Sequence, residues 1–165
     1  MARQAKYGPY NYERILGTRN YHFSADVDAF VQQTNKRMRA LVLQSTEDLI
    51  NQAQTPVAKG GKMRVDTGFL RASGQVSLTG MPSGPTRGDT NKDGSKRKYR
   101  VSDFSASAKL TGFQLGETIF FGWTAEYAKY REAYDGFLYS AIQNWQSIVN
   151  RVAEQIKQRS PANKA

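Results

Sequence analysis

Residues 24–54 read SADVDAFVQQTNKRMRALVLQSTEDLINQAQ, with apolar side chains recurring three and four positions apart. This spacing predicts an α-helix with one apolar stripe, roughly 40 Å long at 1.5 Å per residue. Ser24 is a good N-cap, Asp26 and Asp28 suit the first turn, and Thr55-Pro56 ends the pattern. The stripe comprises Val27, Phe30, Val31, Thr34, Met38, Leu41, Val42, Ser45, Leu49 and Ile50. A helix this long in a small domain is expected to act as a strut.

A second long helix pattern begins after Asp135-Gly136 and ends at Ser160-Pro161. Its apolar positions, again three and four apart, are Phe137, Leu138, Ala141, Ile142, Trp145, Ile148, Val149, Val152 and Ile156. Just before it, Thr124 is expected to cap a short helix that carries Tyr127, Tyr130 and Tyr134.

Three segments between the helices have strand character. Residues 75–79 alternate in polarity, and residues 109–115 and 118–123 are predicted to form an antiparallel hairpin that turns at Gly116-Glu117. The sequence therefore predicts an α+β fold, in which a long N-terminal helix and a long C-terminal helix pack on a small antiparallel sheet.

The remaining segments predict the domain organisation. Residues 1–23 are polar and Tyr-rich with Gly and Pro breakers, which predicts an extended N-terminal arm. Residues 80–108 are rich in Gly, Pro, Ser, Thr, Asp and Lys, which predicts a long flexible loop. We expect a single domain over residues 24–160 with this loop inserted, followed by a tail at 161–165.

Two short motifs lie between the long helix patterns. Residues 65–73 read Val-Asp-Thr-Gly-Phe-Leu-Arg-Ala-Ser, and residues 122–132 read Gly-Trp-Thr-Ala-Glu-Tyr-Ala-Lys-Tyr-Arg-Glu, with Phe137-Leu138 soon after. Neither motif supplies a nucleophile with its base, a metal-ligand set or a phosphate cradle. Their packing and hydrogen-bonding residues favour turns that dock on other protein parts.

Together, the motifs resemble those of the small neck proteins of long-tailed bacteriophages, the head–tail joining or tail-completion proteins. The first matches that family at Asp66, Thr67, Gly68, Leu70, Arg71 and Ser73. The second matches at Gly122, Tyr127, Ala128, Tyr130, Glu132, Phe137, Leu138 and Ala141. One departure is the connection Ala133-Tyr134-Asp135-Gly136, which is shorter than the Gly-Thr and Pro-rich turn usual in the family, so contacts made by the longer turn do not carry over.

The resemblance implies a structural virion protein, made in the host cytoplasm, that assembles as a ring at the head–tail junction. Its expected partners are further copies of itself and other neck, portal or tail proteins, with DNA in the channel as a sequence-independent contact. Residues expected at subunit or partner interfaces are Asp66, Thr67, Leu70, Arg71, Trp123, Tyr127, Tyr130 and Glu132. The Tyr and Trp side chains among them are of the kind enriched in interfaces, although some of them are also expected to line the core.

Composition narrows the function classes. A chain of 165 residues with 39% hydrophobic residues can bury a core, and it has no cysteine for disulfides or thiol chemistry. No apolar run approaches the roughly 20 residues of a membrane span, and no secretory signal is recognisable, so no membrane partner is expected. The net charge of +10 favours polyanionic partners.

A basic stretch in the long loop is the candidate contact for DNA or an acidic partner. It comprises Arg87, Lys92, Lys96, Arg97, Lys98 and Arg100, with Tyr99 interleaved. Such side chains bind phosphates without reading sequence. The alternative is a solvated loop. A small basic nucleic-acid-binding protein is accordingly the second function that the sequence supports.

Three other patterns in the sequence resemble catalytic or metal-binding motifs only in part. Asp66-Thr67-Gly68 matches the aspartic-protease signature, but basic residues and a long helix precede it, so a cap for the following turn is the better interpretation. Asp89-Asn91-Asp93 imitates half a calcium loop, yet Arg100 stands where the closing Glu belongs. His22 is the only histidine and lies in an aromatic stretch. We therefore expect no enzyme activity, no catalytic residue, no metal and no cofactor.

Overall fold

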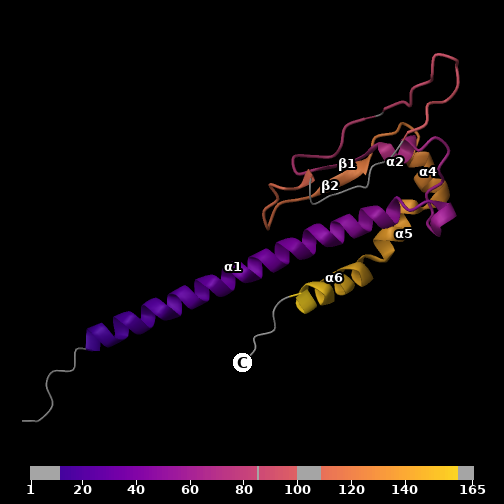
Figure 1. The fold of residues 1–165 in the computed structure, drawn as a ribbon. Coiled ribbons are helices and arrows are strands. Elements are labelled where there is room, and N and C mark those ends of the chain that lie inside the picture. The colour runs from indigo at the N-terminus through magenta and orange to yellow at the C-terminus, as the bar shows by residue number, and fades with distance from the viewer. Residues whose placement is uncertain (1–11, 85, 100–108, 160–165) are drawn as a thin grey trace, which may run out of the picture. The chain divides into compact units, whose positions relative to one another are not determined.

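The computed structural model describes residues 12–84, 86–99 and 109–159, with only the backbone for residues 12–22. The chain divides into two compact units, Met1–Arg37 and Met38–Ala165, whose boundary falls inside the first helix. The elements are α1 (Tyr12–Ala53), η1 (Val57–Lys59), α2 (Phe69–Ala72), β1 (Gly74–Ser77), β2 (Phe120–Trp123), α4 (Ala128–Asp135), α5 (Phe137–Gln143) and α6 (Trp145–Arg159) (Figure 1).

The predicted α+β class is confirmed in the second unit. Here the part of α1 that follows Arg37 packs with the C-terminal helices and a two-stranded antiparallel sheet. One core cluster joins α1 to α5 and α6 through Leu49, Ala53, Phe137, Ala141, Ile148 and Val152. A second joins α1 to the chain before β2 through Leu43, Ile50, Leu110 and Phe113. The apolar stripe predicted from the three-and-four spacing therefore faces a core at its C-terminal end.

The start of α1 differs from the prediction. The helix begins at Tyr12, so Ser24 lies inside it and is not its N-cap. Residues 12–23 are helical, whereas we had predicted an extended arm; the first eleven residues of that arm lie outside the described range. No proline occurs between Pro9 and Pro56, and the single Gly17 costs a helix only about 1 kcal/mol relative to alanine. Local breaker signals therefore did not suffice to end the helix.

The predicted hairpin is wrong, because β2 pairs with β1 and not with residues 109–115. The two strands are antiparallel, with Gly74 opposite Trp123 and Ser77 opposite Phe120. The predicted strands at 75–79 and 118–123 thus exist, with slightly different ends, but they are each other's partners.

Residues 109–115 form turns because the two apolar side chains that they bury lie three positions apart, where a strand would need two or four. Leu110 and Phe113 are both buried, and the Phe113 N–H donates to the Leu110 carbonyl at 3.0 Å. Arg39 of α1 donates from Nε to the Phe113 carbonyl (2.8 Å) and from Nη2 to that of Thr111 (2.6 Å). These bonds satisfy carbonyls that a sheet would otherwise have paired. The predicted turn at Gly116-Glu117 is present, with Gly116 at φ 99°.

The last helix is interrupted, contrary to the single helix that we predicted. Asn144 separates α5 from α6, and its carbonyl accepts a hydrogen bond from Ile148 N–H at 3.0 Å. Both pieces still bury apolar side chains in the same core cluster, which is why the spacing alone did not reveal the break. Upstream, Gly136 at φ 58° separates α4 from α5, as the Asp135-Gly136 pair predicted.

Candidate functional site

The sheet brings the two sequence motifs together, although about fifty residues separate them. The Ser73 carbonyl at the end of the first motif accepts hydrogen bonds from Thr124 N–H (3.1 Å) and its hydroxyl (3.3 Å) in the second. Thr124 is thereby used as a tie between motifs and does not cap α4, whose N-cap is Tyr127. The rings of Phe69 and Tyr127 pack at 6.3 Å between centroids.

The loop that follows β1 closes over the joined motifs. Thr86 N–H donates to the Thr124 carbonyl at 2.7 Å, and Tyr99 N–H donates to the Thr67 carbonyl at 2.7 Å. The Tyr99 ring packs on Phe69 at 5.0 Å, and its phenol accepts a hydrogen bond from Asp89 N–H at 2.6 Å. The described part of this loop is therefore attached to the motifs at both ends.

A pocket of about 670 Å³ lies where these three segments meet. Its aromatic lining comes from Phe69, Tyr99 and Tyr127, and burial raises the pKa of the Tyr127 phenol. Its charged lining comprises the basic residues Arg64, Arg71, Lys96, Arg97 and Arg131 and the acidic residues Asp66 and Asp89. The pocket is thus aromatic in its packing and predominantly basic in its charge.

Three of the six predicted DNA-contacting side chains form ion pairs within the chain. Lys96 Nζ pairs with Asp66 at 2.8 Å, Arg97 with Asp89 at 3.1 Å, and Arg87 with Glu126 at 2.6 Å. The hydrogen bond from Asp66 raises the pKa of Lys96. Within the described residues, Lys92 and Lys98 are exposed and make no ion pair, while Arg100 lies outside them. These pairs hold the loop in place, so the loop offers less free charge than its sequence suggested.

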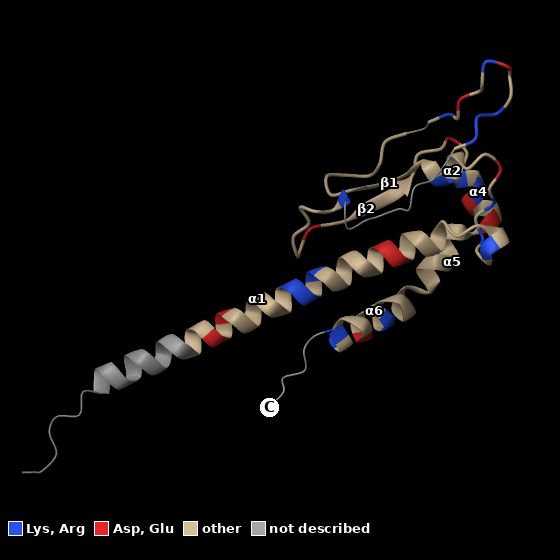
Figure 2. Ribbon diagram, viewed as in Figure 1, with Lys and Arg blue, Asp and Glu red and all other residues tan. Residues whose placement is uncertain are grey.

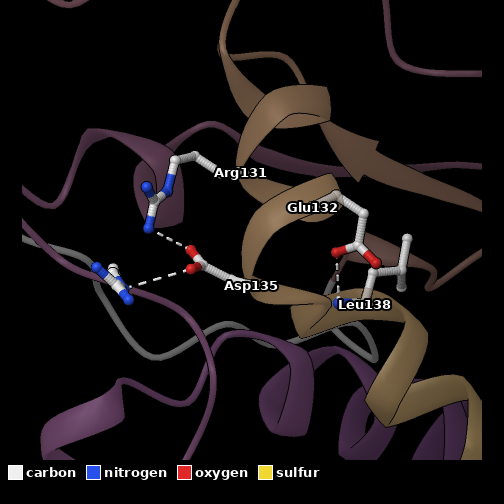
Figure 3. Close-up of polar contacts among 5 residues, drawn as sticks. Arg131, Glu132, Asp135 and Leu138 are labelled. Atoms are coloured by element: carbon white, nitrogen blue, oxygen red, sulfur yellow. Dashed lines mark hydrogen bonds and ion pairs between the residues drawn. The ribbon is translucent and has the colours of Figure 1, made fainter.

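Arg71 differs from the other basic residues of the pocket. Arg131 pairs with Asp135 (Figure 3), and Arg64 pairs with the same carboxylate, whose side chain is only 5% exposed. In the described structure the Arg71 guanidinium has no ion pair, and its Nε is buried without a hydrogen-bond partner. A buried donor without an acceptor costs about 1–3 kcal/mol. Arg71 is therefore the pocket cation that most needs a ligand.

Glu132, which we predicted at an interface, has an internal role. Its carboxylate accepts a hydrogen bond from Leu138 N–H at 2.8 Å (Figure 3) and another from Tyr139 N–H at 2.8 Å. These are first-turn donors of α5, which lack partners within the helix. The carboxylate also complements the positive end of the helix dipole. The capping of α5 thus explains why a glutamate occupies this position of the second motif.

Replacing Glu132 by glutamine is expected to lower the free energy of unfolding by about 1 kcal/mol, because one of two charge-assisted bonds is lost. Chemical denaturation measures this change. The matched control is Glu126→Gln, whose pair with Arg87 is solvent-exposed and should contribute less than about 0.5 kcal/mol. Equal losses in both variants would contradict the capping role.

The other predicted interface residues separate into two groups. Asp66, Thr67, Arg71 and Tyr127 line the pocket, while Tyr130 is exposed on α4. Leu70 also lines the pocket but is 4% exposed within the core, and Trp123 packs edge-on against Phe137 at 5.0 Å. Sequence reasoning missed Phe69, Tyr99 and Arg131 as members of the site, since only the closed loop brings Tyr99 to the first motif.

The residues of the protease-like and calcium-like patterns are engaged by neighbouring residues. Asp66 faces Lys96 and not a second carboxylate, and the Thr67 hydroxyl accepts a hydrogen bond from Phe69 N–H at 3.3 Å. In the calcium-like loop, Asp93 accepts bonds from Ser95 N–H and hydroxyl, which lower its pKa. No group of three or more His, Cys, Asp or Glu suited to a metal ion occurs among the described residues. The side chain of His22 lies outside the described part.

Comparison with known proteins finds no match among family models, curated proteins or solved structures. The resemblance of the two motifs to phage neck proteins therefore stays a prediction. Within the described residues, no helix combines the length and apolar character needed to cross a bilayer.

Proposed function

We propose that this chain is a structural assembly protein of the phage neck, forming a homo-oligomeric ring at the head–tail junction. The observation that carries the proposal is an apolar stripe on the first unit's part of α1. Phe23, Val27, Phe30 and Val31 are all exposed there, the two phenylalanines by about 70% (70% and 68%). We infer a phage protein from the resemblance of the two motifs to those of neck proteins. We infer a ring because a tail has rotational symmetry that its parts must match.

Exposed aromatic side chains at helical spacing are typical of surfaces that another protein covers. Burying one phenylalanine stabilises an association by about 1.5–3 kcal/mol, so a stripe of four apolar residues is a substantial driving force. The pocket at the joined motifs offers a second contact surface, with aromatic and arginine side chains of the kind enriched in interfaces.

Self-association of the purified full chain tests the proposal. Sedimentation at increasing concentration is expected to show an oligomer, and Phe30→Glu is expected to weaken its formation at least tenfold, because a carboxylate would be buried in an apolar contact. The matched control is Gln32→Glu, which adds the same charge at an exposed position on the other side of the helix. A wild-type chain that stays monomeric at every concentration would contradict the ring.

A genetic experiment tests whether the protein acts in the phage neck. In the phage that encodes this chain, deletion of the gene should leave heads and tails that do not join, visible by electron microscopy. Infectious, joined virions without the protein would rule out a neck function, whatever the chain does in solution.

A small nucleic-acid-binding protein is the second candidate, favoured by the net charge of +10 and by the exposed Lys92 and Lys98. Binding of a DNA duplex by the isolated chain, with affinity falling steeply as salt rises, would support it. A ring that forms without DNA affinity would favour the neck function.

A further inference from the structure

We propose that the pocket at the joined motifs is a receptor for α1 of a neighbouring copy, which binds through Asp26, Asp28 and the apolar stripe between them. This inference names the contact surface behind the proposed ring and rests on that proposed function.

Asp26 and Asp28 differ from the other described carboxylates in their contacts. Among the acidic side chains that the structure describes, nearly all have a partner: Asp48, Asp66, Asp89, Glu126, Asp135 and Glu154 form ion pairs, Asp93, Glu117 and Glu132 accept backbone N–H groups, and Glu47 is also engaged. Asp26 and Asp28 alone make no such interaction in this part of the chain. Within the described residues, they are the unpaired negative charges of a strongly basic protein.

Helix geometry places these two carboxylates on either side of the apolar stripe. At about 100° per residue, Phe23, Val27, Phe30 and Val31 fall within one stripe, Asp26 projects beside one edge of it, and Asp28 beside the other. No other charged residue occurs between positions 23 and 35. The segment therefore presents an apolar ridge flanked by two carboxylates.

The side chains that line the pocket complement this helix segment in chemistry. Its aromatic lining can receive an apolar side chain, and its basic residues outnumber its acidic ones. Lysines and arginines gather on and around α2, α4 and the adjoining loop (Figure 2). The unpartnered Arg71 guanidinium can donate two hydrogen bonds to one carboxylate. Lys96, which also lines the pocket and is 74% exposed, can serve as a second contact. The free cation and the free carboxylates are thus complementary.

The symmetry of the contact also fits the proposed assembly. Because the ridge and the pocket are different surfaces, copies joined in this way contact head to tail, which closes into a ring when the rotation allows. Copies that carry a net charge of +10 repel one another, so a contact that pairs their opposite charges favours a defined orientation.

A double-mutant cycle in the full chain tests the inference, with the association constant measured by sedimentation. Arg71→Gln is expected to weaken association about tenfold, as is the paired change Asp26→Asn with Asp28→Asn. Combined, they should weaken it little more than either alone, because each removes the same charge pair. Lys96→Gln provides a second pocket variant should Arg71→Gln unfold the chain, and thermal unfolding reports on folding.

The control is Lys98→Gln, which removes the same charge two positions from Lys96 on the same loop but outside the pocket. Its effect should be under about twofold and additive with the aspartate changes. If Phe30→Glu weakens association and the pocket variants do not, the inference is overturned while the proposed ring stands. A wild-type chain that never associates overturns both.

The same variants distinguish a protein site from a phosphate site. If Arg71→Gln and Lys96→Gln leave self-association unchanged but lower the affinity for a DNA duplex, the pocket binds nucleic acid and the inference is wrong. Non-specific DNA binding should respond to Lys96→Gln and Lys98→Gln alike, whereas the proposed contact responds to the first only.

Discussion

Replacing Gly68 by alanine is expected to lower the free energy of unfolding by about 2–4 kcal/mol and to open the pocket. Gly68 has φ 83°, a conformation that costs a residue with a Cβ about 1–2 kcal/mol. A Cβ at this position would also lie 2.5 Å from the carbonyl oxygen of Tyr99. The loop would have to move away, with loss of the hydrogen bond between Tyr99 N–H and the Thr67 carbonyl.

A second glycine of the chain separates the cost of the positive φ from the cost of the clash with the Tyr99 carbonyl. Gly60 has the same φ of 83°, but a Cβ there meets nothing within 4 Å. Gly60→Ala should therefore cost only the conformational part, about 1–2 kcal/mol, and leave the loop attached. Chemical denaturation measures both losses, and limited proteolysis within residues 86–99 reports on the loop. Equal destabilisation of the two variants would show that the Tyr99 contact contributes nothing.

Local patterns in the sequence predicted the parts of the fold that depend on near neighbours. The three-and-four spacing identified the helical segments, although not the start of α1 or the break at Asn144, and Asp135-Gly136 marked the turn between α4 and α5. Gly68, Thr67 and the short turn at Phe69 followed from the first motif. The predicted partner of β2 was wrong because strand pairing is decided by contacts between distant segments, and residues 109–115 have strand-like composition without the alternation of a buried strand.

The candidate site was predictable only in part, for the same reason. The motifs identified Asp66, Arg71 and Tyr127, all of which line the pocket. The ion pairs that fix Lys96 and Arg97 join loop residues to carboxylates that sequence spacing cannot assign. Glu132 illustrates a different limit: a polar residue in a recurrent motif is expected at a surface contact, whereas its carboxylate caps a helix that begins five residues later.

Asp135→Asn is the other substitution with a large expected effect. The Asp135 carboxylate is 5% exposed and forms ion pairs with Arg64 (3.4 Å) and Arg131. It ends α4, where the helix dipole disfavours a negative charge, so the two arginines must more than offset that cost. Removing one partner of a buried pair typically costs 3–5 kcal/mol. Because Arg64 is 74% exposed and can return to water, we expect a loss of about 2 kcal/mol.

Glu154→Gln is the matched control for this change. Its pair with Lys157 spans 3.9 Å between well-exposed side chains and should contribute less than about 0.5 kcal/mol. Both losses are measured by chemical denaturation. Arg131 lines the pocket, so the loss of its partner should also alter self-association. If Asp135→Asn is as mild as Glu154→Gln, the buried carboxylate does not hold α4 and the pocket arginines in place.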